Sequence, residues 1–167
     1  MSYSDENLQA AGDFFSRDTR EKVGVIVRDR DNKLLIVEGA TGKHSLPKGG
    51  RYMHESTYEG ALRECWEETG LDLWHAAPEK KIKLVFGTYY VFHLPVSGKT
   101  LSLAPQPGEC VKVLWKNPGS YWLKELASKN VDLAAYVSSC KKSRAYYWQK
   151  KRDSIWKAKH TQPDKSD

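Results

Sequence analysis

The sequence lacks any long apolar run. Its longest apolar stretches, residues 23–27 and 34–37, fall far short of the roughly 20 residues that a helix needs to cross a bilayer. No membrane partner is therefore expected. The first 20 residues are polar and lack the charged-then-apolar order of a signal peptide, although a secreted chain already trimmed of that peptide would look the same. We expect the protein to act in the cytoplasm.

Cysteines are few and odd in number. Cys65, Cys110 and Cys140 show no paired spacing, which argues against a disulfide scaffold or a zinc site and favours reduced, mostly buried thiols. Internal repeats and Pro/Gly/Ser-rich linkers are also missing, so nothing divides the chain into two cores. We expect a polar segment over residues 1–20, one domain over 21–160 and a flexible tail over 161–167.

The positive charge is confined to one segment. The whole chain carries a net charge of +6, whereas residues 141–160 alone carry eight Lys and Arg and one Asp, which leaves the remainder at −1. Aromatic residues are interleaved with these cations. A basic segment of this kind predicts a polyanionic partner, and Lys141 to Lys159 is a candidate for RNA contact. The alternative is an amphipathic helix whose aromatics pack on the domain while its lysines face solvent.

Periodicity predicts an α/β fold with a mixed sheet. Residues 22–28 and 33–37 are β-branched and flank an Asp-Asn turn, which is typical of a hairpin, and a Gly/Pro/Lys-containing loop follows over 41–51. Further strands are expected within 81–96 and over 111–115. Helices are expected over 121–129 and from 130 to about 159, the second being long and basic.

A helix is strongly predicted between Ser56 and Thr69. Apolar side chains recur there at helical spacing, and Gly70 is suited to the left-handed conformation that ends helices. The apolar positions are Tyr58, Ala61, Leu62, Cys65 and Thr69.

The same helix carries three acidic side chains on one face. Glu64, Glu67 and Glu68 are spaced i, i+3 and i+4, and like charges at this spacing repel, with Arg63 as the immediate relief. A hard divalent cation such as Mg²⁺ removes this repulsion, because it favours carboxylate oxygens together with water and substrate phosphate. On these three residues alone, a solvated acidic helix face is the better interpretation.

The frame around the glutamates decides between these interpretations. Gly49 is followed after five residues by Glu55 and after seven more by Arg63-Glu64-Cys65-Trp66-Glu67-Glu68-Thr69-Gly70-Leu71. This segment resembles the signature of the Nudix hydrolase superfamily at every fixed position. The resemblance implies an α/β/α sandwich and a pyrophosphohydrolase that cleaves phosphoric anhydride bonds with Mg²⁺ or Mn²⁺.

The resemblance also implies individual roles. Glu64, Glu67 and Glu68 would be the metal ligands, with Glu67 and Glu68 counted among the catalytic residues together with Arg63, which would orient a catalytic glutamate. Of the remaining motif positions, Gly49 would shape the loop, Glu55 would join its polar network and Gly70 would end the helix.

A further catalytic candidate is Glu109. It lies in a Pro/Gly-containing loop six residues before Trp115, an offset similar to that in decapping enzymes and dinucleoside polyphosphate hydrolases, where a loop glutamate acts as ligand or base. The alternative is an ordinary solvated loop residue.

Substrate choice depends on loops outside the motif. The Pro-Lys-Gly run at 47–49 resembles that of decapping enzymes, and Lys48 is placed to pair with substrate phosphates. Lys43, His44 and Arg51 flank it as further candidates for substrate binding. We therefore rank mRNA 5′-cap hydrolysis first, diphosphoinositol polyphosphate hydrolysis second and dinucleoside polyphosphate hydrolysis third. A catalytically inactive RNA-binding Nudix module is disfavoured, because binding alone would not need carboxylates that repel phosphate.

Overall fold

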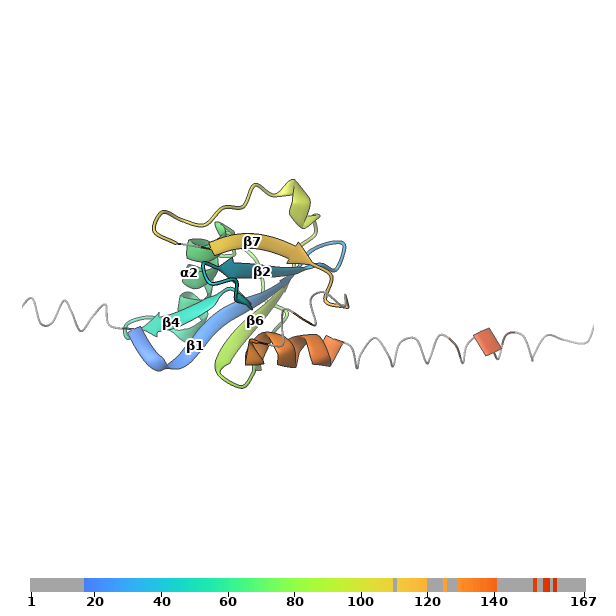
Figure 1. Ribbon diagram of the computed structural model, residues 1–167, viewed down its shortest axis with the longest axis horizontal. Coiled ribbons are helices and arrows are strands. Elements are labelled where there is room, and N and C mark those ends of the chain that lie inside the picture. Colours follow the sequence, from blue (N-terminus) through green and yellow to red (C-terminus); the bar gives the residue numbers. More distant parts are fainter. Residues whose placement is uncertain are drawn as a thin grey trace, which may run out of the picture.

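The computed structural model describes residues 17–109, 111–119, 125 and 129–140, together with residues 152, 155, 156 and 158; for residues 17–20 it describes the backbone alone. A seven-stranded mixed sheet forms the centre of this part of the chain (Figure 1). The strands follow the order β3-β2-β1-β6-β5, while β4 pairs with β1 and β7 pairs with β2. No helix in the described part of the chain is long and apolar enough to cross a membrane.

Strands β1 (Arg17–Arg28) and β6 (Gly87–His93) are the parallel pair at the middle of the sheet. The remaining pairings are antiparallel and join β2 (Leu34–Gly39), β3 (His44–Ser45), β4 (Lys48–Tyr52), β5 (Lys80–Lys83) and β7 (Val111–Lys116). A short 3-10 helix, η1 (Gly98–Thr100), precedes β7. The expected mixed sheet and α/β class are confirmed.

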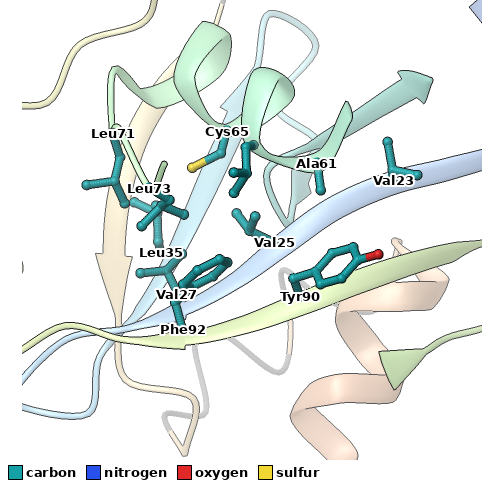
Figure 2. Close-up of a cluster of buried hydrophobic side chains, with 11 residues drawn as sticks. Val23, Val25, Val27, Leu35, Ala61, Cys65, Leu71, Leu73, Tyr90 and Phe92 are labelled. Atoms are coloured by element: carbon teal, nitrogen blue, oxygen red, sulfur yellow. The ribbon is translucent and has the colours of Figure 1, made fainter. Parts of the chain in front are cut away.

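Helices cover both faces of the sheet. Helix α2 (Thr57–Thr69) packs on one face, where Val23, Val25 and Val27 of β1 meet Ala61 and Cys65 of the helix (Figure 2). A helix over residues 131–140 lies against the other face and contributes its own apolar side chains to a second cluster. That cluster comprises Ile26, Leu34, Ile36, Leu46, Tyr89, Val91, Leu133 and Val137. Because both faces are buried, β1 and β2 are apolar on both sides.

The structure corrects three sequence-based expectations. Residues 41–51, expected as a loop, contain β3 and β4, because their backbones pair with β2 and β1 although glycine and lysine disfavour strands. Strand β1 begins at Arg17 and so takes in the last residues of the segment expected to be separate. The hairpin of β1 and β2 pairs only at Arg28 and Leu34, beyond which the two strands take other partners.

The expected C-terminal helices lie mostly outside the described residues. Within them, residues 131–140 are helical, as are residues 125, 152, 155, 156 and 158. Asp132 anchors the 131–140 helix to the sheet, since its carboxylate accepts hydrogen bonds from the Tyr89 hydroxyl at 2.8 Å and the Phe86 amide at 2.9 Å. Cys65 is a buried free thiol, as expected, whereas Cys140 is a free thiol that is only half-buried; Cys110 lies outside the described residues.

The ends of α2 agree with their sequence signals. The Ser56 hydroxyl accepts the Glu59 amide at 3.1 Å, and Gly70 adopts φ 76° while its amide donates to the Trp66 carbonyl. Gly70 has a second function that the sequence does not reveal, because a Cβ there would lie 2.5 Å from the Ala104 carbonyl oxygen.

We therefore expect Gly70→Ala to destabilise the protein more than Gly42→Ala. Gly42 adopts a similar φ of 80°, but a methyl group added there would meet nothing within 4 Å, so its substitution isolates backbone strain of about 1 kcal/mol. Gly70→Ala adds the collision with Ala104, which displaces the loop that follows. Urea denaturation of both variants measures the difference; equal losses of unfolding free energy would contradict the packing contact.

Candidate active site

Helix α2 brings the three predicted glutamates to one face. Glu64 is buried, with 3% of its surface exposed, while Glu67 and Glu68 are half-buried. The opposite side of the helix is fixed to the sheet through Ala61, Leu62 and Cys65. The apolar side of the helix therefore determines where its carboxylates point.

The glycine loop lies directly against this helix. A Cβ at Gly49 would overlap the carboxyl group of Glu64, so only glycine lets the β4 backbone come this close. The sequence assigns Gly49 to a tight loop, whereas the structure places it in β4, paired with Val23, with the Glu64 carboxyl group against it.

Arg63 connects the loop to the carboxylates. Its Nε donates to Glu55 Oε2 at 2.9 Å and one terminal nitrogen donates to Glu55 Oε1 at 2.8 Å and to the Gly50 carbonyl at 2.9 Å. The other terminal nitrogen donates to Glu64 at 3.1 Å and to Glu67 at 3.0 Å. Burial by itself lowers the pKa of Arg63, but these carboxylates outweigh it and the pKa lies above its usual value.

Glu55 occupies the polar network that the sequence predicted for it. It is buried, and its carboxylate also accepts the Tyr52 amide at 2.8 Å. Burial favours its protonated form, yet the hydrogen bonds from Arg63 and Tyr52 and the charge of Arg63 hold the pKa of Glu55 below its usual value. An ionised Glu55 is thus a fixed anchor for Arg63.

The loop before β7 brings Glu109 to the helix. The Gln106 amide donates to the backbone carbonyl of Glu67 at 2.7 Å, and the Glu109 amide donates to the Gln106 carbonyl at 3.1 Å. Glu109 is close enough to Glu68 for its charge to raise the pKa of that residue. The structure therefore brings together Glu64, Glu68 and Glu109, which are separated by up to 45 positions in the numbering.

Glu68 is the acid most perturbed by this gathering. Burial and the charges of Glu64 and Glu109 raise its pKa from 4.5 to about 8, although the charge and backbone amide of Lys48 act in the opposite direction. In the metal-free protein, a carboxyl group with this pKa exchanges a proton near neutral pH.

The four residues predicted to bind substrate differ in position. Lys48 lies beside Glu68, where its backbone amide donates to the carboxyl group. Arg51 donates to the backbone carbonyls of Tyr52 and Glu55, at 3.2 and 2.7 Å, and so supports the loop. His44 is buried, with its Nε2 3.9 Å from Glu38 Oε1, and Lys43 is exposed. Only Lys48 is shown next to the carboxylates; substrate contact by the four residues stays a prediction.

The carboxylates suit a hard divalent cation. Glu64, Glu67, Glu68 and Glu109 gather here, and the structure shows Arg63 and Lys48 beside them. In the part of the chain that the structure describes, no three Asp, Glu, His or Cys side chains already form a metal cage. Mg²⁺ does not need one, because it binds through one or two carboxylates plus water and substrate phosphate. Glu64 and Glu67, whose carboxylates Arg63 holds in place, are hard oxygen donors of this kind and fit the cation.

Two contributors to the site were missed in the sequence. Tyr52 lies against Arg63, whose central carbon is 4.0 Å from the ring centroid, and Gln106 fastens the Glu109 loop through its backbone. A backbone contact leaves no side-chain signal. Tyr52 lies between the fixed positions of the motif, where its aromatic character has no predictable partner until the loop is folded.

The raised pKa of Glu68 predicts a pH-dependent stability in metal-free protein. Because its pKa is about 8 when folded and 4.5 when unfolded, the folded state holds the extra proton between these values. Its stabilising contribution is full below pH 4.5 and is lost as pH rises toward 8, at no more than about 1.4 kcal/mol per pH unit. Glu68→Gln should remove this dependence.

Urea denaturation in chelator between about pH 5 and 8, the interval set by the two pKa values, measures the effect. Glu59→Gln, which replaces an exposed glutamate in the first turn of α2, is the control and should keep the wild-type pH profile. Parallel profiles for wild type and Glu68→Gln would contradict the assignment.

Comparison with solved structures identifies proteins of the same fold. The protein is similar to a C. elegans Ap4A hydrolase solved as a binary complex, with 16% identity over 77% of this chain and 99% of that chain and a TM-score of 0.55. An ADP-ribose pyrophosphatase from Streptococcus suis matches with 19% identity over 74% and 92% of the two chains and a TM-score of 0.52.

A third structure is a bifunctional NMN adenylyltransferase/ADP ribose pyrophosphatase from Francisella tularensis, complexed with AMP and a manganese ion. It matches with 15% identity over 83% of this chain and 45% of that chain and a TM-score of 0.59. No curated protein matches in sequence. At these identities the likenesses establish the fold.

The family itself is shown by a sequence match. The family model described as the NUDIX domain covers residues 18–136, which is more than half of the chain and includes the whole glycine loop, α2 and the Glu109 loop. Three fixed positions of the Nudix signature, Glu55, Glu64 and Glu67, lie together in the structure around a fourth, Arg63. The chain therefore belongs to the Nudix family and is a pyrophosphohydrolase that acts on phosphoric anhydride bonds.

Proposed function

We propose that this hydrolase removes the 5′ cap from RNA by cleaving a phosphate–phosphate bond within the cap. The observation that carries the proposal is the placement of Glu109 beside Glu68, where Lys48 also supplies a positive charge. Glu109 is the residue whose offset from Trp115 resembles that in decapping enzymes and dinucleoside polyphosphate hydrolases. Its proximity to Glu68 supports a role in the reaction and counts against an ordinary solvated loop position.

The residues around α2 would divide the work. Glu64, Glu67 and Glu68 would hold Mg²⁺ or Mn²⁺, which when bound neutralises phosphate charge and lowers the pKa of a water molecule. Arg63 keeps one oxygen each of Glu64 and Glu67 occupied and so fixes their orientation. Glu68 and Glu109 are the candidates to accept a proton from the attacking water, and Lys48 would attract the phosphate chain.

The C-terminal segment supports a long polyanionic substrate. Lys141 to Lys159 holds all of the excess positive charge, and within it Ile155 and Trp156 are 49% and 61% exposed. These values do not agree with the interpretation in which both side chains pack into the domain. An exposed indole ring among cations suits stacking on a base beside phosphate contacts.

Dinucleoside polyphosphates are a second candidate substrate. The fold likeness to the C. elegans Ap4A hydrolase extends over 99% of that chain, and Ap4A, like an RNA cap, joins two nucleosides through a chain of phosphates. The same carboxylates and Lys48 would serve either bridge. Diphosphoinositol polyphosphates share the high negative charge without the nucleosides.

Turnover of the three substrates side by side tests the proposal. Cap-labelled RNA, Ap4A and a diphosphoinositol polyphosphate are each supplied with Mg²⁺ and with Mn²⁺. We expect release of a cap nucleotide at the highest kcat/KM. Glu67→Gln is the blank and should lose turnover by at least about 100-fold with the fold retained, because a neutral amide is a poorer ligand for a hard cation.

Preferential cleavage of Ap4A or of the inositol compound would overturn decapping while leaving the Nudix chemistry intact. Undiminished activity of Glu67→Gln would instead refute the assigned metal site.

Deleting residues 141–167 tests the RNA contact. The deletion removes the eight Lys and Arg of residues 141–160 together with Lys165. It should weaken binding to uncapped RNA and flatten the dependence of log affinity on log salt concentration, with about 0.7 units of slope lost per phosphate contact. Fluorescence anisotropy at several salt concentrations measures this, and circular dichroism checks that the truncated chain folds. Replacing the eight Lys and Arg by Gln in the full chain is the matched variant; an unchanged slope there would exclude the contact.

A further inference from the structure

The guanidinium group of Arg63 is held around its whole edge. All three of its nitrogens donate hydrogen bonds, to Glu55, Glu64, Glu67 and the Gly50 carbonyl. Edge bonds of this kind fix the group within its own plane but leave the tilt of that plane dependent on what covers its face. The ring of Tyr52 covers it, with the central carbon of Arg63 4.0 Å from the ring centroid.

We propose that Tyr52 is a positioning residue for the metal-binding carboxylates. Its ring sets the plane of the Arg63 guanidinium, and one terminal nitrogen of that group then holds Glu64 and Glu67 together. Because Arg63 bonds one oxygen of each glutamate, its plane determines the direction in which both carboxylates face. The ring thus controls the arrangement of the metal ligands through the arginine.

The nitrogens of Arg63 are divided unequally among the carboxylates. Nε and one terminal nitrogen both bond to Glu55, with their shortest bonds at 2.9 and 2.8 Å, within the usual range for charge-assisted bonds. The other terminal nitrogen alone is shared between Glu64 at 3.1 Å and Glu67 at 3.0 Å. A small tilt of the guanidinium would keep the hydrogen bonds to Glu55 and weaken those to Glu64 and Glu67.

Tyr52 is suited to a clean test because its backbone and side chain have separate functions. The Tyr52 amide donates to Glu55 at 2.8 Å, and β4 pairs Tyr52 with Arg17; both are backbone interactions that a substitution preserves. The ring also stacks on His54, with centroids 5.8 Å apart and planes 9° apart, which orients it. Replacing the side chain therefore removes the ring from Arg63 and retains the loop.

The experiment compares Tyr52→Leu, Tyr52→Phe and a control, Tyr58→Leu. Phenylalanine keeps the aromatic face and loses only the hydroxyl, whereas leucine is apolar and has no face to attract a cation. Tyr58 is a partly buried tyrosine of α2 that contacts the Tyr90 ring edge-on at 5.0 Å and packs on the core, so its replacement costs packing without uncovering Arg63.

Binding of Mn²⁺ alone, measured by electron paramagnetic resonance, is the main readout. We expect Tyr52→Leu to weaken Mn²⁺ binding about three- to tenfold, the range that losing a partly desolvated cation–π contact produces. Tyr52→Phe should stay within about twofold of wild type, and Tyr58→Leu should lower the urea midpoint with unchanged Mn²⁺ affinity. On whichever substrate is turned over, Tyr52→Leu should lower kcat more than it raises KM.

Three results would overturn the proposal. Wild-type Mn²⁺ affinity in folded Tyr52→Leu would leave the ring with a structural role alone, and equal weakening in Tyr58→Leu would assign the effect to general loosening. A loss in Tyr52→Phe of about tenfold, the full range of the cation–π contact, would assign it to the hydroxyl, and this variant decides the matter even if the leucine variant does not fold. Because Mn²⁺ binding needs no substrate, failure of the decapping assay would not affect this test.

Discussion

The site depends on one half-buried cation, Arg63, that is surrounded by acids. Arg63 donates to three glutamates and a backbone carbonyl, and its position decides how α2, β4 and the loop before α2 meet. Removing it would leave buried carboxylates facing one another in a medium of low dielectric, where repulsion is strong. Glu55 anchors the guanidinium of Arg63. Because the pKa of Glu55 is held low, its carboxylate stays charged.

Glu68 stays perturbed even with this arginine in place. Its pKa is raised first by burial and then by the charges of Glu64 and Glu109, against the opposing charge and backbone amide of Lys48. Such a site favours the binding of a divalent cation or, near neutral pH, of a proton. Hydrolysis of a phosphoric anhydride requires both. The same acidic side chains therefore contribute to the raised pKa of Glu68 and to the chemistry.

Close backbone approach is the second constraint. Gly49 lets β4 lie against Glu64, and Gly70 lets the segment at Ala104 lie against the end of α2. Gln106 then bonds to the backbone of Glu67, which brings the Glu109 loop to the carboxylates. The helix therefore lies between β4, which precedes it closely in sequence, and the more distant segment that follows Ala104, and in each case a glycine permits the close approach.

Much of this could be predicted from the sequence because its signals are local. The spacing of Ala61, Leu62 and Cys65 determined α2, Ser56 and Gly70 determined its ends, and the motif determined which carboxylates share a face. The short strands β3 and β4 could not be predicted, since their residues disfavour strands and backbone pairing with β2 and β1 creates them.

The contacts between segments were decided by the tertiary structure alone. The Tyr52 ring on Arg63, Glu109 beside Glu68 and the burial of His44 each join residues through space, and no periodicity encodes such a meeting. By itself the sequence determined the family, the reaction class and the carboxylates of the helix, because these depend on residue types at fixed short spacings. Only the folded chain decided the pKa of Glu68 and the support of Arg63, because both depend on burial and on charges brought from distant segments.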